Sequence, residues 1–174
     1  GGASDPTDDR PYLRAGYTMS WGANHLFIFG GTLAYEQRKV NDLYVTNLDR
    51  MVWMKMQPTG ERPIERDGHC TVFDPVRKRL LVFGGRSIQK KRLNDLYSYD
   101  MVSNTWSKMA PEGNLPAPRE YGNMVLLNDD TAVLFGGRGS GQRYNDMHFL
   151  DLKHPKLMWS QPIIAGSAPS PRQD

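Results

Sequence analysis

The chain alternates between short apolar runs and polar turns, and one kind of apolar run occurs three times. "HLFIFGG" at 25–31, "RLLVFGG" at 79–85 and "TAVLFGG" at 131–137 combine branched and aromatic residues and end in two glycines. Runs of this length and composition are typical of β-strands, and no stretch shows the three- and four-residue apolar spacing of an amphipathic helix. The pattern therefore predicts an all-β chain.

Several other markers repeat with the same period, which is about 53 residues. An Asn-Asp pair begins at 41, 94 and 145. The single-residue markers are Trp53, Trp106 and Trp159, together with Arg14, Arg66, Arg119 and Arg172. A fixed period of this length indicates supersecondary units that stack on one another. We predict an N-terminal extension at 1–13, repeats at 14–65, 66–118 and 119–171, and the start of a further repeat at 172–174.

Each repeat is predicted to form four short strands. "GYTMSW", "GHCTVF" and "GNMVLL" supply the first strand, and the runs that end in two glycines supply the second. "NDLYVTNLD", "NDLYSYD" and "NDMHFLD" supply the third, and the strand with Trp is the fourth. "DPVRKR" and "LNDDT" are expected to be tight hairpin turns, because Asp-Pro and Asn-Asp favour turn geometry.

These repeats resemble the kelch repeat. "ERDGHCTVF", "LLVFGG" and "YSYDMVSNTW" in the second unit match every part of its signature. The first unit replaces Tyr-Asp by Leu-Asp, and the third has an extra residue after Arg119 and two more before Trp159. The resemblance implies a β-propeller of four-stranded blades, in which Trp on the outer strand fills the space between blades.

Kelch propellers usually have five to seven blades, so the resemblance implies that about three blades here are part of a larger ring. We expect further blades of the same chain to complete it, or a second copy of the chain to close a ring across a two-fold axis. Without such completion the outer blade faces would be an aggregation hazard.

Charge is concentrated in the loops between the second and third strands of the repeats, at 32–40, 86–93 and 138–144. These loops contain eight basic residues and one acid, Glu36, whereas the formal charge of the whole chain is only +3. We interpret the loops as a docking surface for an anionic partner; simple solvation of long loops is the alternative. The candidate contacts are Arg38, Lys39, Arg86, Lys90, Lys91, Arg92, Arg138 and Arg143.

Arg14, Arg66 and Arg119 form a second set of candidate contacts. The resemblance places them in the connections between blades, on the same face as the basic loops, where similar domains use Arg to hold ligands. The alternative is a structural role, in which each Arg bridges neighbouring blades through paired acids.

The sequence thus predicts a protein–protein interaction module that docks an acidic or phosphorylated segment, as a scaffold or as the substrate-recognition part of a larger protein. One alternative is the regulatory kelch region of a protein phosphatase or ubiquitin-ligase adaptor. A lesser one is nucleic-acid binding, with Tyr35 and Tyr144 stacking on bases; the small number of aromatic residues in these loops argues against it.

We expect no catalysis, metal or cofactor in this segment. A copper-radical oxidase built on a related propeller needs a Tyr–Cys crosslink and two His ligands, and here only Cys70 beside His69 resembles that arrangement. Cys70 is expected to be a small buried hydrophobe. No apolar stretch approaches the ~20 residues of a membrane span. A single cysteine and a polar N-terminal stretch favour an intracellular protein, cytoplasmic or nuclear.

Overall fold

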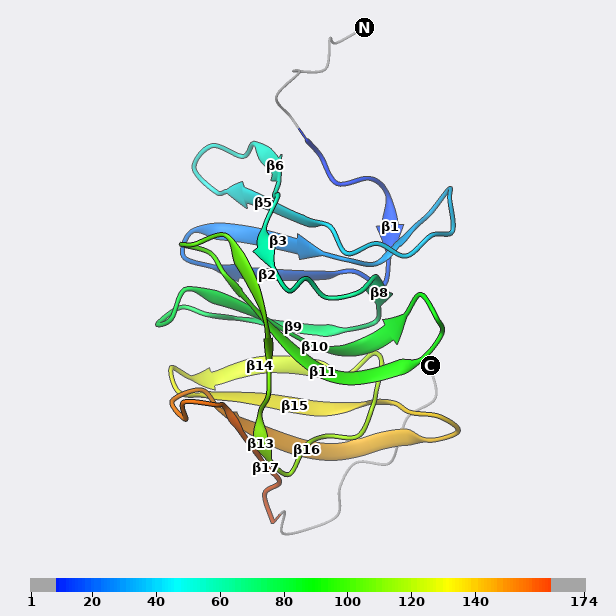
Figure 1. The fold of residues 1–174 in the computed structure, drawn as a ribbon, viewed down its shortest axis with the longest axis vertical. Helices are drawn as coiled ribbons and strands as arrows, with labels where there is room; N and C mark the ends of the chain where they lie inside the picture. The colour runs from blue at the N-terminus through cyan, green and yellow to red at the C-terminus, as the bar shows by residue number, and fades with distance from the viewer. Residues whose placement is uncertain (1–8, 164–174) are drawn as a thin grey trace, which may run out of the picture.

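Residues 9–163 are described by a computed structural model, in which three β-sheets are stacked one on the next (Figure 1). The described residues form strands and turns and no helix, so the all-β prediction is confirmed. None of them forms a helix that could cross a membrane. The predicted start of a further repeat at 172–174 lies outside the described residues.

The first sheet is antiparallel, with the strand order β2 (Thr18–Gly22), β3 (His25–Phe29), β5 (Leu43–Asn47) and β6 (Trp53–Lys55). Two short strands, β1 (Arg14–Ala15) and β4 (Thr32–Leu33), pair with each other beside it. The four main strands are those that the sequence pattern predicts.

The second sheet repeats this order with β9 (Cys70–Asp74), β10 (Arg79–Ser87), β11 (Arg92–Asp100) and β12 (Thr105–Met109). β8 (Arg66–Asp67) pairs with the end of β10. The third sheet consists of β14 (Asn123–Asn128), β15 (Thr131–Arg138), β16 (Arg143–Asp151) and β17 (Met158–Ser160).

The second and third sheets each gain an edge strand that four-stranded blades do not have. β7 (Thr59–Gly60) runs parallel to β12, and β13 (Glu112–Gly113) runs parallel to β17. Both lie in the connection that leaves the preceding sheet, so the chain adds a strand to the outer edge of the next blade before entering it. Residues 59–60 therefore pair with the sheet of the second repeat, although the predicted boundary assigns them to the first.

Aromatic residues fill the two interfaces between sheets. The ring of Trp106 lies 5.1 Å from that of Phe29 in the first sheet, and the ring of Trp159 lies 5.3 Å from that of Phe83 in the second. Trp106 and Trp159 are both 1% exposed, whereas Trp53, on the outermost sheet, is only half-buried. Trp106 and Trp159 therefore each pack on the Phe that precedes the paired glycines of the sheet before them.

The paired glycines allow the next blade to approach closely. Gly84 has φ +64°, and a Cβ added to it would stand 2.9 Å from the carbonyl oxygen of Arg119, at the start of the next repeat. The amide of Gly85 donates to the same carbonyl at 2.8 Å, as the amide of Gly31 donates to Arg66 at 2.9 Å. The glycines thus fix the position at which each following repeat begins.

Apolar side chains are exposed on the two outer faces of the stack. Met19 and Trp21 are 60% and 68% exposed on the first sheet, and Val125 and Leu127 are 58% and 64% exposed on the third. Completion of a ring by further blades or by a second copy stays a prediction, and these are the faces that it would cover.

Candidate docking surface

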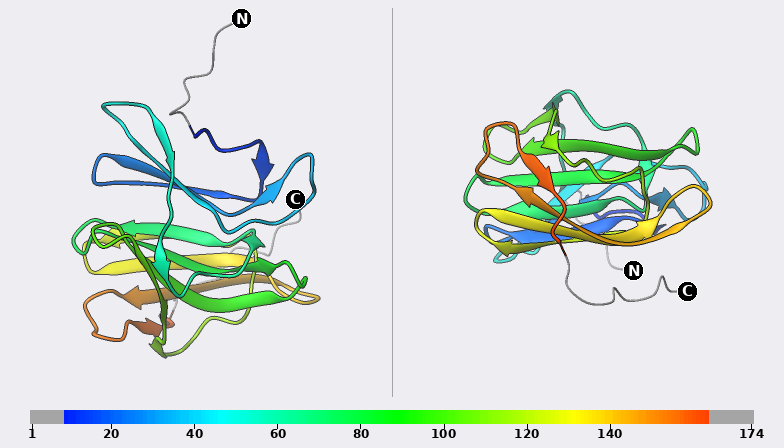
Figure 2. Two further views of the ribbon diagram at one scale, coloured as in Figure 1. Left: turned by 45° about the horizontal axis from the view of Figure 1, so that its top comes forward. Right: turned by 90° about the horizontal axis from the view of Figure 1, so that it is seen from below.

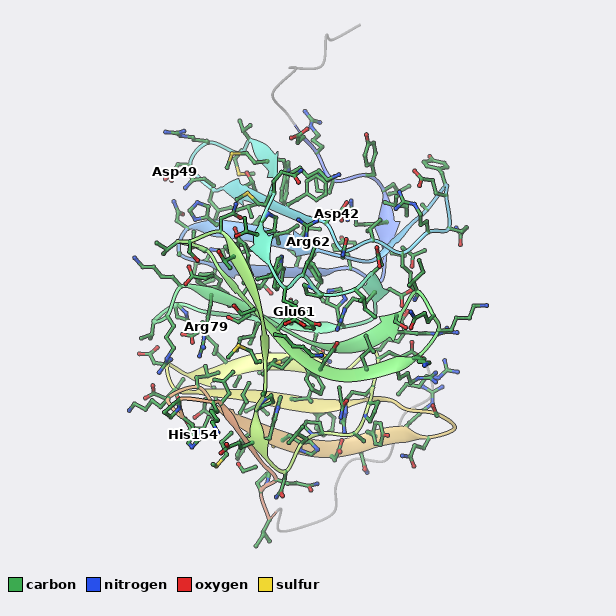
Figure 3. All side chains as sticks on the ribbon, viewed as in Figure 1. Asp42, Asp49, Glu61, Arg62, Arg79 and His154 are labelled. Atoms are coloured by element: carbon green, nitrogen blue, oxygen red, sulfur yellow. The ribbon has the colours of Figure 1, made fainter. Side chains whose placement is uncertain are left out.

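The hairpin loops between the second and third strands of the sheets lie along one edge of the stack, with β1 and β8, and the other turns lie along the opposite edge (Figures 1 and 2). Asp49, Arg79 and His154 are at that opposite edge (Figure 3). The turns there, at 47–53, 74–79, 100–105, 128–131 and 151–158, contain six acids and six bases. The excess of positive charge is therefore confined to the loop edge.

Arg14, Arg66 and Arg119 occupy equivalent positions at the start of the three repeats and are buried. The exposed fractions of their side chains are 2%, 0% and 0%. Each pairs with the Asp of the Asn-Asp marker in its own repeat: Arg14 with Asp42, Arg66 with Asp95 and Arg119 with Asp146.

The Arg66 guanidinium shows how fully these groups are used. Its Nε donates to the carbonyl of Ile64 at 3.1 Å, and its Nη1 donates to the carbonyl of Gly84 at 2.9 Å. Both Nη atoms reach the carboxylate of Asp95, at 2.6 and 2.9 Å, and the group lies over the ring of Tyr97, 5.4 Å from its centroid. Four of the five N–H donors of this guanidinium are used within the blade, and the side chain is fully buried, so a partner cannot reach the group.

Their burial and pairing disfavour the prediction that these three arginines contact a partner, and we leave them out of the proposed docking surface. Their role is structural, but it also differs from the predicted alternative, because each pairs with an acid of its own blade rather than bridging two. In the third repeat, burial would raise the pKa of Asp146, but hydrogen bonds from Arg119 and His148 outweigh burial and lower it. The carboxylate thus stays ionised beside the arginine.

Two of the predicted loop bases link neighbouring blades. Lys39 of the first repeat pairs with Asp67 of the second, whose carboxylate also accepts from Thr32 at 2.8 Å. Arg92 of the second repeat pairs with Glu120 of the third, through Nη2 at 2.7 Å and Nε at 3.1 Å. Glu120 is only 3% exposed. These two bases hold the blades together and are poorly placed for docking.

The other predicted loop bases are the ones that solvent can reach. Lys90 and Lys91 are exposed at the tip of the β10–β11 hairpin, where Lys90 has φ +62°. Arg138 and Arg143 are exposed in the third repeat. Arg38 is exposed and pairs with Glu36 at 2.9 Å, in a bridge whose two side chains are each 57% exposed. Arg86 is half-buried.

The structure adds one residue to this edge that the sequence analysis missed. Tyr121 has φ +57° and is 59% exposed. Gly16 and Gly68 stand in the same place of the other repeats, with φ +64° and +60°. Strand pairing agrees, because Phe135 lies opposite Asn123 as Phe83 lies opposite Cys70. The third repeat therefore has no extra residue after Arg119, contrary to the prediction; it has Tyr where the others have Gly.

A surface depression of about 280 Å³ lies beside the first sheet, and Arg38 is the one predicted loop base in its lining. Its lining mixes Lys55, Arg38 and Arg62 with Glu36, Glu65 and Asp42, and the Asp42 carboxylate is already bound by Arg14. Figure 3 labels Asp42 and Arg62 there. Its mixed charge and engaged carboxylate make it a weaker candidate than the loop edge.

The described residues offer neither a metal site nor a reactive thiol. They contain no group of three or more His, Cys, Asp or Glu side chains that could hold a metal ion. Cys70 is buried, and its Sγ donates to the carbonyl of Gly122 at 3.0 Å. Burial raises the pKa of the thiol to about 12, so it stays protonated at neutral pH.

Comparisons with known proteins agree with the repeat pattern. Residues 16–174 match the family model described as the KLHDC2/KLHL20/DRC7 Kelch-repeats domain. The chain is 43% identical over 134 residues to dynein regulatory complex subunit 7 of Chlamydomonas reinhardtii. This match covers 77% of this chain and 12% of that protein.

Two further relatives are 30% identical to the chain. The match to kelch repeat-containing protein 2 of Saccharomyces cerevisiae covers 84% of this chain and 18% of that protein. The match to host cell factor of Drosophila melanogaster covers 94% of this chain and 12% of that protein. The chain thus spans less than a fifth of the length of each of these three relatives. The family match and the three stacked sheets show that the chain belongs to the kelch-repeat family, whose fold is a β-propeller.

Proposed function

We propose that the chain is a protein-interaction module that docks an acidic or phosphorylated segment of a partner on its loop edge. The observation that carries the proposal is the distribution of charge: the loops between second and third strands hold eight bases and one acid, whereas the opposite turns are balanced. A surface of one sign attracts an oppositely charged partner and orients it during encounter.

The docking contacts we propose are Lys90, Lys91, Arg138, Arg143 and Arg38, with Arg86 beside them. Lys39 and Arg92 are left out because their pairs with Asp67 and Glu120 are largely buried, whereas the pair of Arg38 with Glu36 is exposed to solvent. The proposed docking contacts act on a partner through solvent, so each contributes modestly to the binding free energy. This contribution falls as salt is added.

The relatives support an interaction role. One is named for a dynein regulatory complex and another for the kelch repeat itself. Neither name refers to a catalytic activity, and we propose a non-enzymatic role for this segment. We propose that it serves the assembly of a protein complex through the docked segment.

The test is a pair of charge reversals with the same change in net charge. The variant Lys90→Glu/Lys91→Glu reverses exposed bases of the loop edge, and Arg50→Glu/Lys78→Glu reverses two exposed bases of the opposite edge. Arg92 is kept, because replacing it would also break its pair with Glu120. The probe is a fluorescent peptide of Glu and Gly, titrated at several salt concentrations beside a Gln–Gly peptide.

We expect the loop variant to weaken binding of the Glu–Gly peptide about tenfold, which corresponds to about 1.4 kcal/mol, and the opposite-edge variant to change it less than about twofold. Equal losses in both variants, or equal affinity for the Gln–Gly peptide, would contradict the proposal. Tighter binding to duplex DNA than to the peptide at the same salt concentration would also contradict it, in favour of nucleic-acid binding.

A further inference from the structure

Tyr121 adopts a backbone conformation that the other two repeats give to glycine. A side chain makes the left-handed region of backbone conformation unfavourable, and Gly16 and Gly68 avoid that cost in the same place. Strain of this kind persists where the surroundings impose it, and it often marks a functional position. Tyr121 is also 59% exposed, so its ring is not kept there as part of the core.

The ring of Tyr121 lies across the junction between the second and third blades. Its backbone amide donates to the carbonyl of Gly68 at 2.6 Å. A Cβ added to Gly68 would stand 3.2 Å from Cε1 and Cζ of the Tyr121 ring. The missing side chain of one repeat therefore makes room for the aromatic side chain of the next, and this places the phenol at the loop edge.

The acids nearest to this junction are already bound by other bases. Asp67 lies opposite Arg86 in the pairing of β8 with β10, and Glu120 forms an isolated bridge with Arg138. Yet the carboxylate of Asp67 is bound by Lys39, and that of Glu120 by Arg92. In the part of the chain that the structure describes, Arg86 and Arg138 consequently have no carboxylate of their own.

The side chain of Arg86 has one hydrogen-bond donor without an acceptor within residues 9–163. Its Nε is buried and has no hydrogen-bond partner among the described residues. An unpaired buried donor costs free energy, and an anionic acceptor would remove that cost. Burial of the Tyr121 phenol, together with the charges of Asp67 and Glu120, raises its pKa. The charges of Arg86 and Arg138 act in the opposite direction and are outweighed. The phenol therefore stays an O–H donor at neutral pH.

We propose that Tyr121, Arg86 and Arg138 form a site that binds the anionic oxygens of one partner side chain, either a carboxylate or a phosphoryl group. The site joins two blades and combines two guanidinium groups with a neutral phenol donor, which suits an oxyanion. This inference rests on the proposed docking function and adds the position at which one acidic side chain of the segment is held.

The decisive variant is Tyr121→Gly, because it restores the residue that the other repeats use. A packing role for Tyr121 predicts a loss of thermal stability. The binding role predicts a melting temperature that is unchanged or higher, since the backbone strain is relieved, with affinity lowered about tenfold through the loss of a hydrogen bond to a charged group.

The probes are fluorescent Gly–Ser peptides that carry at one position Glu, phosphoserine or Gln. Arg86→Gln should weaken the same peptide as Tyr121→Gly, and Tyr121→Phe tests the phenol alone. Tyr35→Gly is the matched control, because Tyr35 is 90% exposed in another loop of the same edge. Selective weakening of the Glu or the phosphoserine peptide supports the site and identifies which oxyanion it holds.

Two results would overturn the site. One is a lower melting temperature of Tyr121→Gly with unchanged affinity for both anionic peptides. The other is equal weakening by Tyr121→Gly and Tyr35→Gly. If Lys90→Glu/Lys91→Glu still weakens the acidic peptide in either case, the docking function stands and only this site fails; if no variant changes affinity, both fail.

Discussion

Basic residues occur in two regions of this chain, and the same charge serves different purposes in them. Arg14, Arg66 and Arg119 lie inside the blades, and each is held by a carboxylate and by backbone carbonyls. Lys90, Lys91 and Arg138 lie on the loop edge in contact with solvent. The first group is needed to form the surface on which the second is displayed.

The comparison shows why position in the repeat matters more than residue type. A buried guanidinium that satisfies a carboxylate cannot be removed without leaving a charge unpaired, whereas an exposed one can. Lys39 and Arg92 lie between these extremes, because they are loop residues that pair with acids of the next blade. Stability measurements and binding measurements should therefore separate the three groups.

The largest effect on stability is expected for Arg66→Ala. This change leaves the Asp95 carboxylate without its guanidinium and removes the hydrogen bond to Gly84. We expect the free energy of unfolding to fall by about 3–5 kcal/mol, measured by urea denaturation. Lys91→Ala is the control and should change it by less than about 0.5 kcal/mol. A similar small change for both variants would show that the buried pairs do not support the blades.

A smaller effect is expected for the link between the second and third blades. Arg92→Ala leaves the nearly buried carboxylate of Glu120 without its partner, at a cost of about 1–3 kcal/mol. Arg138→Ala is a matched control, because Arg138 bridges Glu120 through the backbone only. It should leave stability nearly unchanged and weaken acidic-peptide binding. The opposite result would contradict these roles: a loss of stability in Arg138→Ala, and weaker peptide binding with unchanged stability in Arg92→Ala.

A third effect depends on pH and arises at the interface between the first two blades. Burial, with a smaller contribution from Arg66, lowers the pKa of His69 from 6.5 to about 3. Its Nε2 lies 2.8 Å from Oγ1 of Thr18. Below pH 6.5 the unfolded chain binds a proton that the folded chain does not, so the stability associated with neutral His69 is lost as the pH falls.

Urea denaturation between about pH 4.5 and 6.5 tests this expectation above the range where most carboxylates titrate. The His69→Gln variant should lose less stability as the pH falls, by about 1.4 kcal/mol for each pH unit. Equal slopes for the two proteins would mean that His69 is protonated in the folded state.

The strands of the fold could be predicted from the sequence because their signals are local. Apolar runs that end in two glycines and a Trp at a fixed interval recur in every repeat. β7 and β13 have no such signal: each has only two residues and exists because it lies beside the outer strand of the next sheet. The family comparison supports the same fold by an independent route.

The sequence left a contact role open for the three buried arginines, because burial is not visible in a list of charges. A signal was nevertheless present, since Arg and the Asp of Asn-Asp recur together, 27 to 29 residues apart, in all three repeats. Tyr121 was missed because the repeats were aligned on their glycines, which placed a gap where the chain has a substitution. Backbone conformation, with φ +57° at Tyr121, corrects that alignment.

An acidic segment that docks on the loop edge should perturb the amide signals of that edge in NMR spectra, and mapping those signals locates the bound peptide. With the Glu–Gly peptide we expect shifts at Tyr121, at Lys90 and Lys91, and in the loop at 138–144. Signals of the turns at 47–53 and 100–105 should not move. Shifts confined to those turns, or to the outer faces around Trp21 and Leu127, would contradict docking on the loop edge.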